Sequence, residues 1–312
     1  MPYGFRVRFI LAPGRRIDCQ DKALTLETTE GHRFQIEAVE GGPVGKTANL
    51  SILSRGYDDA ESATAVGQRV KDTLLLASAA IHLGADMGRE KALCWINPDI
   101  IDMMRKEHKV EHLNDIHGLT VFSTNLPICI GFSSGASLTV HMRSDQLQQS
   151  FSQNYAFADC VTERQKLAAE LINLIHFEHS QRARFLMLIT ALEVLVKPKE
   201  HPPEYQVARC RLRNLAGSVT EDQSILQYLK DGLGMMKRQS LTKACKDMVA
   251  RCIDDSAASE VPQLYDLRSR IIHRGAGISA DEVRKHSTKL LEMVTSTLLA
   301  DVRRSADVAA DL

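Results

Sequence analysis

The chain has 312 residues, of which 44% are hydrophobic and 25% are charged, enough for one large domain or two ordinary domains with packed cores. Basic and acidic residues balance at 39 each, and the halves balance too: residues 1–155 carry 16 basic and 18 acidic residues, and residues 156–312 carry 23 and 21. This balance excludes binding of nucleic acid through bulk charge, so any RNA contact must be a local patch.

Cysteine usage and hydropathy favour a cytoplasmic protein. The seven cysteines are scattered and include no Cys-x-x-Cys pair, which argues against a disulfide framework or a zinc knuckle. No apolar run approaches 18 residues, so no membrane span is expected, and the N-terminus lacks the apolar block of a signal peptide. We expect neither a metal nor another cofactor.

The N-terminal half reads as strands followed by a long helix. Alternating residues such as Phe5, Val7 and Phe9 predict strands over residues 3–54. A helix is predicted over 58–84, with Asp58 or Asp59 as its N-cap and Gly84 at its end. Further elements are a helix at 98–106 and short strands at 119–122 and 137–141. Residues 1–150 are therefore expected to form a β-rich α+β domain.

Two stretches of this half invite a functional interpretation. Gly41–Thr47 resembles a phosphate loop, but Glu40 occupies the position of its first glycine and the residues after Lys46 look extended, which favours a turn between strands. His108 and His112 are four apart and would share a helical face, with His117 nearby as a third ligand. A solvated charged surface is the better interpretation, because no supporting shell is evident.

Strand signals vanish after about Ser144, and the second half reads as an all-helical bundle with short connections. The chain is therefore predicted to be an α+β two-domain protein, with an N-terminal domain over 1–150, a helical domain over 155–304 and a tail over 305–312. The predicted helices cover residues 159–176, 184–196, 206–216, 224–232, 241–253, 261–273 and 280–303.

The helix that ends near Gly275 carries the main candidate site. Leu264, Leu267, Ile271 and Ile272 predict one buried stripe, while the other faces carry Asp266, Arg268, Ser269, Arg270 and His273. Arginine binds a phosphodiester through paired donors, and histidine can transfer protons near neutral pH. The alternative is ordinary capping, because basic residues in a last turn offset the helix dipole.

Glu193 is an acidic residue on an apolar helix face, four residues after Ile189 and three before Val196. A buried carboxylate is costly unless paired, and arginine is its preferred partner. We therefore predict that Glu193 meets an arginine of the 268–274 cluster, unless it reaches water at the rim of the bundle. His176 and His179 are interpreted as surface or core histidines rather than metal ligands.

The second half, over roughly residues 155–304, resembles an Apea-like HEPN domain, a helical bundle of the HEPN superfamily. Three stretches carry the resemblance: the apolar helix 185–195 that ends near an acidic residue, the stretch 232–249 with Lys-Arg-Gln-Ser before a helix, and Leu264 to Gly275. The last contains the family signature, an arginine followed after four to six residues by histidine.

The resemblance implies a metal-independent endoribonuclease with Arg268 and His273 as the catalytic pair. His273 would act as general base or acid for attack by the 2′-hydroxyl, and Arg268 would stabilise charge on the phosphate, giving a 2′,3′-cyclic phosphate. Arg270, Arg274 and Ser269 would assist in RNA binding. The family commonly dimerises with two motifs facing, which implies a homodimer here with both copies at one cleft. Residues five apart point about 140° away from each other on a helix, so either the helix loosens near Gly275 or Arg268 and His273 serve different jobs.

Two functions remain open from the sequence. One is an endoribonuclease effector, such as a toxin or an antiphage protein, whose N-terminal domain binds a regulatory partner. The other is a non-catalytic RNA-binding or dimerisation module, favoured by the weak net charge and by Ser269, where many active members have asparagine, aspartate or histidine. An Arg268 held by Glu193 with no open cleft at His273 would favour the second.

Overall fold

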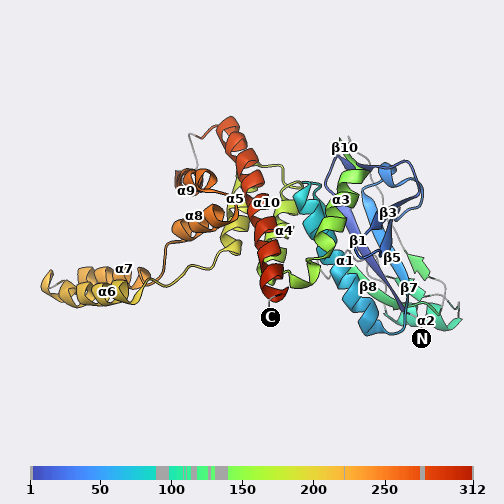
Figure 1. Cartoon of the computed structure of the whole chain (residues 1–312), viewed down its shortest axis with the longest axis horizontal. Coiled ribbons are helices and arrows are strands. Elements are labelled where there is room, and N and C mark those ends of the chain that lie inside the picture. Colours follow the sequence, from blue (N-terminus) through green and yellow to red (C-terminus); the bar gives the residue numbers. More distant parts are fainter. Residues whose placement is uncertain are drawn as a thin grey trace.

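The computed structural model describes residues 3–88, 98–107, 109, 111–113, 118–125, 128–130, 140–220, 222–274 and 278–310. An antiparallel sheet covered by helices forms the N-terminal part, and the C-terminal part is helical, as the sequence predicts (Figure 1). Within these ranges, no helix combines the length and the apolar character needed to cross a membrane.

The sheet arises from the alternating pattern of the first 57 residues. Its main path has the order β3-β4-β5-β1-β6, and β8 pairs with β1. Phe5, Val7 and Phe9 of β1 are fully buried. Two small sheets flank it, a parallel β2–β10 pair and a parallel β7–β9 pair. The strands are β1 (Tyr3–Leu11), β2 (Arg15–Asp18), β3 (Ala23–Glu27), β4 (Arg33–Ala38), β5 (Asn49–Tyr57), β6 (Ala85–Asp86), β7 (Glu111–Leu113), β8 (Gly118–Ser123), β9 (Ile128–Ile130) and β10 (Val140–Arg143).

The glycine-rich stretch Gly41–Thr47 is a connection, as predicted. It contains the short 3-10 helix η1 (Val44–Lys46) and leads directly into β5 rather than into an α-helix. A Cβ at Gly45 would lie 2.7 Å from the carbonyl oxygen of Cys19, so close packing against the loop after β2 explains this glycine.

The histidine motif after helix α2 (Pro98–Glu107) is not a pair on one helical face. His112 lies in strand β7, where side chains alternate between two faces, so the helical interpretation of its spacing was wrong. His108 and His117 lie outside the described residues.

Helix α1 (Ala60–Ala80) joins the two parts of the molecule. The Asp59 carboxylate caps its start by accepting a hydrogen bond of 2.7 Å from the Ser62 amide. One side of α1 packs on β1 and β8, and other sides pack on α3 (Ser144–Tyr155) and α4 (Glu163–Leu174). The hydrophobic core is therefore continuous from the sheet into the helical part.

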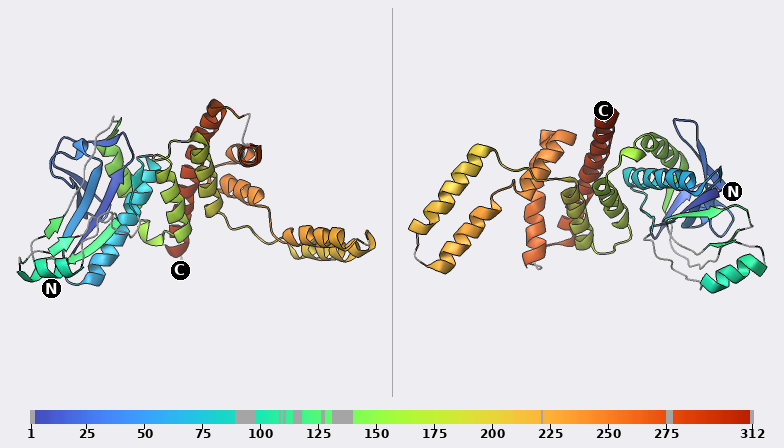
Figure 2. Two further views of the ribbon diagram at one scale, coloured as in Figure 1. Left: turned by 180° about the vertical axis from the view of Figure 1, so that it is seen from behind. Right: turned by 90° about the horizontal axis from the view of Figure 1, so that it is seen from below.

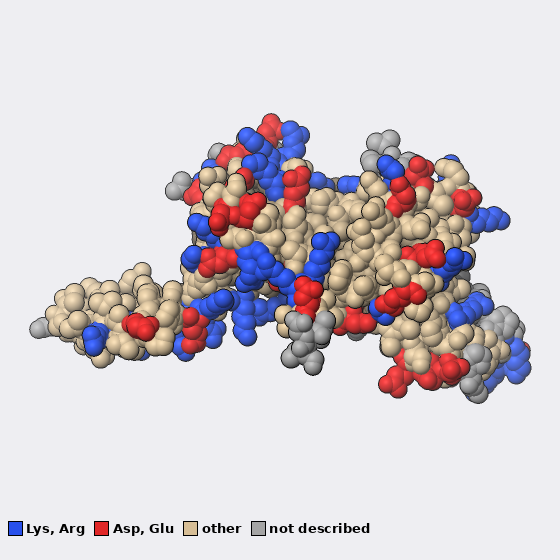
Figure 3. Space-filling model, in the orientation of Figure 1, with Lys and Arg blue, Asp and Glu red and all other residues tan. Residues whose placement is uncertain are grey.

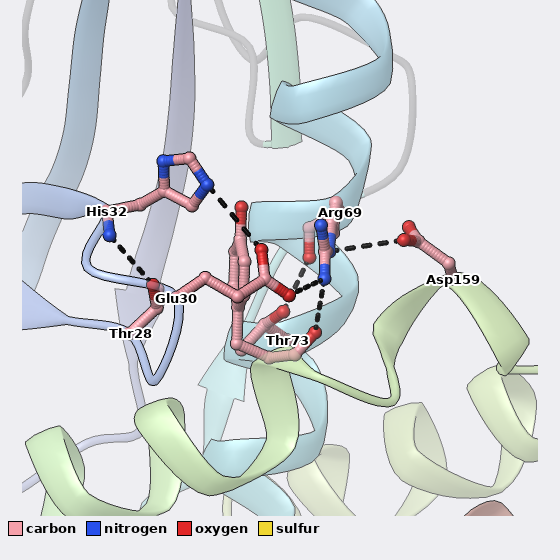
Figure 4. A network of polar contacts seen from close by, with 7 residues as sticks. Thr28, Glu30, His32, Arg69, Thr73 and Asp159 are labelled. Carbon is pink, nitrogen blue, oxygen red and sulfur yellow. Dashed lines mark hydrogen bonds and ion pairs between the residues drawn. The ribbon is translucent and has the colours of Figure 1, made fainter. Parts of the chain in front are cut away.

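Polar contacts reinforce this connection. Arg69 of α1 forms ion pairs with Glu30 in the β3–β4 turn at 2.6 Å and with Asp159 at 3.2 Å, and its guanidinium lies 4.2 Å from the ring centre of Tyr155 (Figure 4). The buried Asn173 side chain accepts a hydrogen bond from the Ala85 amide at 3.0 Å and so binds α4 to β6. A buried amide paired in this way fixes one relative orientation of the two parts.

Helices α4, α5, α8, α9 and α10 pack together, but α6 and α7 project from them as a hairpin, which we call the arm (Figures 1 and 2). Placing α6 and α7 inside a bundle was therefore wrong, because neither helix contains a buried residue. Residues 305–310, expected in a tail, continue α10. The bounds are α5 (Gln181–Leu195), α6 (Pro203–Leu215), α7 (Gln223–Met235), α8 (Leu241–Cys252), α9 (Asp255–Arg274) and α10 (Ala280–Ala310).

Candidate functional site

Helix α9 places the candidate residues around one buried stripe. Leu264, Leu267 and Ile271, spaced at three and four residues, are at most 8% exposed. Ile272 is 48% exposed, so its assignment to the stripe was wrong. It lies 100° beyond Ile271 on the helix, which carries it past the edge of the apolar face. Gly275 and Gly277, expected to stop the helix, lie outside the described residues.

Glu193 meets Arg268, which confirms the expected pairing. The Arg268 Nε lies 3.6 Å from Glu193 Oε1, and the two side chains come from α9 and α5. The Glu193 side chain is 16% exposed and that of Arg268 is 38% exposed. The carboxylate therefore pairs with the arginine on the buried side of α9, while part of the guanidinium still reaches solvent.

Tyr265 and Cys245 complete this cluster and were missed in the sequence. The Tyr265 hydroxyl lies 3.2 Å from the Cys245 sulfur of α8. Burial, the contact with Cys245 and the nearby Glu193 carboxylate all raise the pKa of Tyr265, and burial raises the pKa of Cys245 to about 11. Both groups are therefore neutral near pH 7. The only local signal was that Tyr265 precedes Arg268 by three residues, which places both on one helix face.

Arg270 is held by two carboxylates rather than left open for a ligand. Its Nη2 lies 2.7 Å from Glu282 Oε1 of α10, and its Nε lies 3.1 Å from Asp266 Oδ2. The hydrogen bond to Glu282 is the main cause that raises the pKa of Arg270. In a single chain the contact with Glu282 joins α9 to α10, and both contacts neutralise the charge that the sequence interpretation assigned to RNA binding.

The structure separates the two residues of the signature. Helix α9 continues unbroken through both Arg268 and His273, so their side chains leave the axis about 140° apart. His273 and Ser269 are exposed, and the side chain of Arg274 lies outside the described part. One chain therefore does not direct Arg268 and His273 at the same phosphate.

A second polar feature lies where the arm joins the helical part, and we call it the basic hollow. Lys197 and Lys199, just after α5, line two adjoining hollows. Arg251 of α8 contributes to one, and Arg164 and Arg238 contribute to the other. Figure 3 shows lysine and arginine side chains gathered near this junction. These cations exceed the acidic lining residues Asp247 and Glu200, so the hollow attracts anions.

His176, just after α4, serves the packing between the two parts of the chain. The His176 Nδ1 lies 3.4 Å from Arg15 Nη2, and burial, followed by the charge of Arg15, lowers the pKa of His176 to about 3. His179 is exposed. Within the described ranges, no three His, Cys, Asp or Glu side chains are grouped closely enough to hold a metal ion.

Comparisons of the chain with protein-family models, with curated proteins and with solved structures give no match.

Proposed function

We propose that this protein is a metal-independent endoribonuclease of the HEPN type, whose active sites form between two copies of α9. The observation that carries the proposal is Arg268, which is anchored by the largely buried Glu193 and still 38% exposed on its side chain. The exposed part of this guanidinium can receive a phosphate, which then competes with Glu193 for it.

The second copy supplies what one copy lacks. Because Arg268 and His273 diverge by about 140°, the proposed site takes Arg268 from one chain and His273 from its partner. His273 removes the proton from the 2′-hydroxyl, whose oxygen then attacks phosphorus. The bond to the 5′-oxygen breaks, and that oxygen receives a proton back from the His273 imidazolium. Arg268 stabilises the charge that develops on the phosphate oxygens.

A non-catalytic RNA-binding or dimerisation module is the second candidate. The contact between Arg268 and Glu193 favours it, because a carboxylate at 3.6 Å competes with phosphate for the same guanidinium. The carboxylates of Asp266 and Glu282 likewise compete with phosphate for Arg270.

Mixing two inactive variants provides the test. Purified protein is incubated with RNA in EDTA, and the cut ends are analysed for 2′,3′-cyclic phosphate. Arg268→Ala and His273→Ala should each abolish cleavage, while His179→Ala, which removes another exposed histidine, should retain it. An equimolar mixture of the two inactive variants should recover about one quarter of the wild-type activity, since half of the dimers are mixed and each contains one intact site.

Two results would contradict the proposal. If wild type and His273→Ala cleave RNA equally little, the protein is not a ribonuclease, and the non-catalytic binding module is favoured. Activity in wild type with no recovery in the mixture would place the whole site within one chain.

A further inference from the structure

The arm is the least covered part of the described molecule. Neither α6 nor α7 contains a buried residue, and the arm stands clear of the other helices in both views of Figure 2. Eight of its large apolar side chains are between 48% and 85% exposed: Val207, Leu212, Leu215, Val219, Ile225, Tyr228, Met235 and Met236. A hairpin of two helices offers too little surface to build a core of its own.

The exposed apolar residues form two ordered stripes. On α6, Ala208, Leu212 and Leu215 follow spacings of four and three residues. On α7, Ile225 and Tyr228 are three apart, and Met235 follows seven residues later. These are the spacings with which helices pack against partner helices in coiled coils and bundles.

Both stripes lie on the same broad face of the arm. Two hydrogen bonds mark the sides on which the helices meet: the Arg209 Nη1 donates to the Leu233 carbonyl at 3.1 Å, and Gln206 Nε2 donates to the carbonyl of Lys237, just after α7, at 2.8 Å. Around each helix axis, the apolar stripe is rotated by roughly a quarter to a third of a turn from the side that meets the other helix, in the same rotational sense. Because the two helices run in opposite directions, this equal rotation brings both stripes to the same face of the arm.

The base of the arm is ordered, so the face is presented at a defined place. Glu200 and Arg238 form an antiparallel bridge, and the Gln239 amide donates a hydrogen bond to the Lys199 carbonyl at 2.9 Å. The two chain segments that lead to the arm are thereby held side by side. A paired base of this kind restricts the arm more than two separate linkers would.

We infer that this apolar face is an interface with a second copy of the chain, in which two arms pack into a four-helix bundle. The five large stripe residues, Leu212, Leu215, Ile225, Tyr228 and Met235, expose on the order of 600 Å², at the upper end of the largest apolar patch of a typical monomer and at the lower end of what each partner contributes to a stable interface. Arg211 and Asp231 border the stripes of α6 and α7 with opposite charges, which suits a self-complementary pair.

The inference does not depend on ribonuclease activity. It is tested with the full chain by sedimentation velocity over protein concentrations around 10 µM, comparing wild type with Leu212→Asp and Met235→Asp. We expect a wild-type dimer and a dissociation constant raised about 100-fold or more in each variant, since an unpaired carboxylate would be buried at the interface. Val207→Asp is the matched control, because Val207 is 52% exposed but lies about 100° from the α6 stripe.

The substituted residues are exposed, so each variant should fold, with a circular dichroism spectrum that matches wild type at concentrations low enough to dissociate the wild-type dimer. A monomeric wild type would overturn the inference, and so would a dimer that is equally stable in both stripe variants, or one that Val207→Asp weakens to the same extent. If the stripe variants remain dimeric and the protein cleaves RNA, the arm is not the interface, but the proposed pairing of two copies through α9 still stands.

Discussion

Glu193→Gln separates a structural role of Arg268 from a role in binding phosphate. The substitution keeps the size of the side chain and removes its charge, so the main loss is the ion pair at 3.6 Å. Two full charges at that distance would attract by roughly 4–5 kcal/mol at an effective dielectric constant of about 20. Solvent reaches 38% of the Arg268 side chain, and burying Glu193 costs free energy, so the net loss of stability should be about 1 kcal/mol.

The same change should increase RNA affinity if Arg268 binds phosphate. Removing the competing carboxylate frees the guanidinium, and an energy of about 1 kcal/mol corresponds to an approximately fivefold lower dissociation constant. Urea unfolding gives the stability, and fluorescence anisotropy with a labelled single-stranded RNA gives the affinity. Arg268→Ala should weaken both, because it leaves Glu193 without its cation and removes the phosphate ligand.

Asp266→Asn is the matched control for this experiment. Asp266 is also a carboxylate of the α9 region, but it pairs with Arg270 and its side chain is 71% exposed. It changes the net charge by the same amount without touching Arg268. If Glu193→Gln lowers stability but leaves RNA affinity unchanged, or if Asp266→Asn raises affinity equally, then Arg268 is not a phosphate ligand and the proposed site is wrong.

Three further predictions concern the core and the basic hollow. Because the pKa of Cys245 is raised, its contribution to stability is full below about pH 9 and is lost, by about 2 kcal/mol, as the pH rises towards 11. In Cys245→Ala, the free energy of unfolding measured with urea should therefore fall less between pH 9 and 11. Alkylation mapped by mass spectrometry should modify the exposed Cys210 well before Cys245. The lowered pKa of His176 acts in the opposite direction, with stability full above about pH 6.5 and reduced by about 3 kcal/mol at pH 4.5, a loss that His176→Gln should remove. Lys197→Ala with Lys199→Ala should lower the slope of log affinity for single-stranded RNA against log salt by about 1.4, and an unchanged slope would exclude the hollow from the RNA path.

The sequence predicts contacts best where burial forces a choice. Glu193 sits on an apolar face, and a carboxylate there needs a cation, so its arginine partner could be expected before any coordinates. The identity of that arginine could not, because Arg268, Arg270 and Arg274 differ only in helix rotation. Arg270 instead pairs with Glu282, a residue of α10 that no pattern within α9 indicates.

The arm shows what the periodicity of apolar residues cannot predict. The patterns of α6 and α7 predict amphipathic helices and the structure contains them, but an apolar stripe does not specify what covers it. Burial in the same chain was the default assumption and was wrong. Likewise, the contact between Tyr265 and Cys245 joins residues of two helices, and its position depends on how α8 and α9 pack.

The charges around α9 give a physical reason why a single copy would bind RNA weakly. Arg268 is compensated by Glu193, and Arg270 by Asp266 and Glu282, so this end of the helix has little net attraction for a polyanion. The proposed site gains binding strength only if a phosphate displaces Glu193 from Arg268 or if a second copy adds its own arginine and histidine. On the proposed function, Glu193 therefore restrains the site in the free chain. A neutral protein with such a restraint would avoid indiscriminate binding of cellular RNA, and assembly would control when it acts.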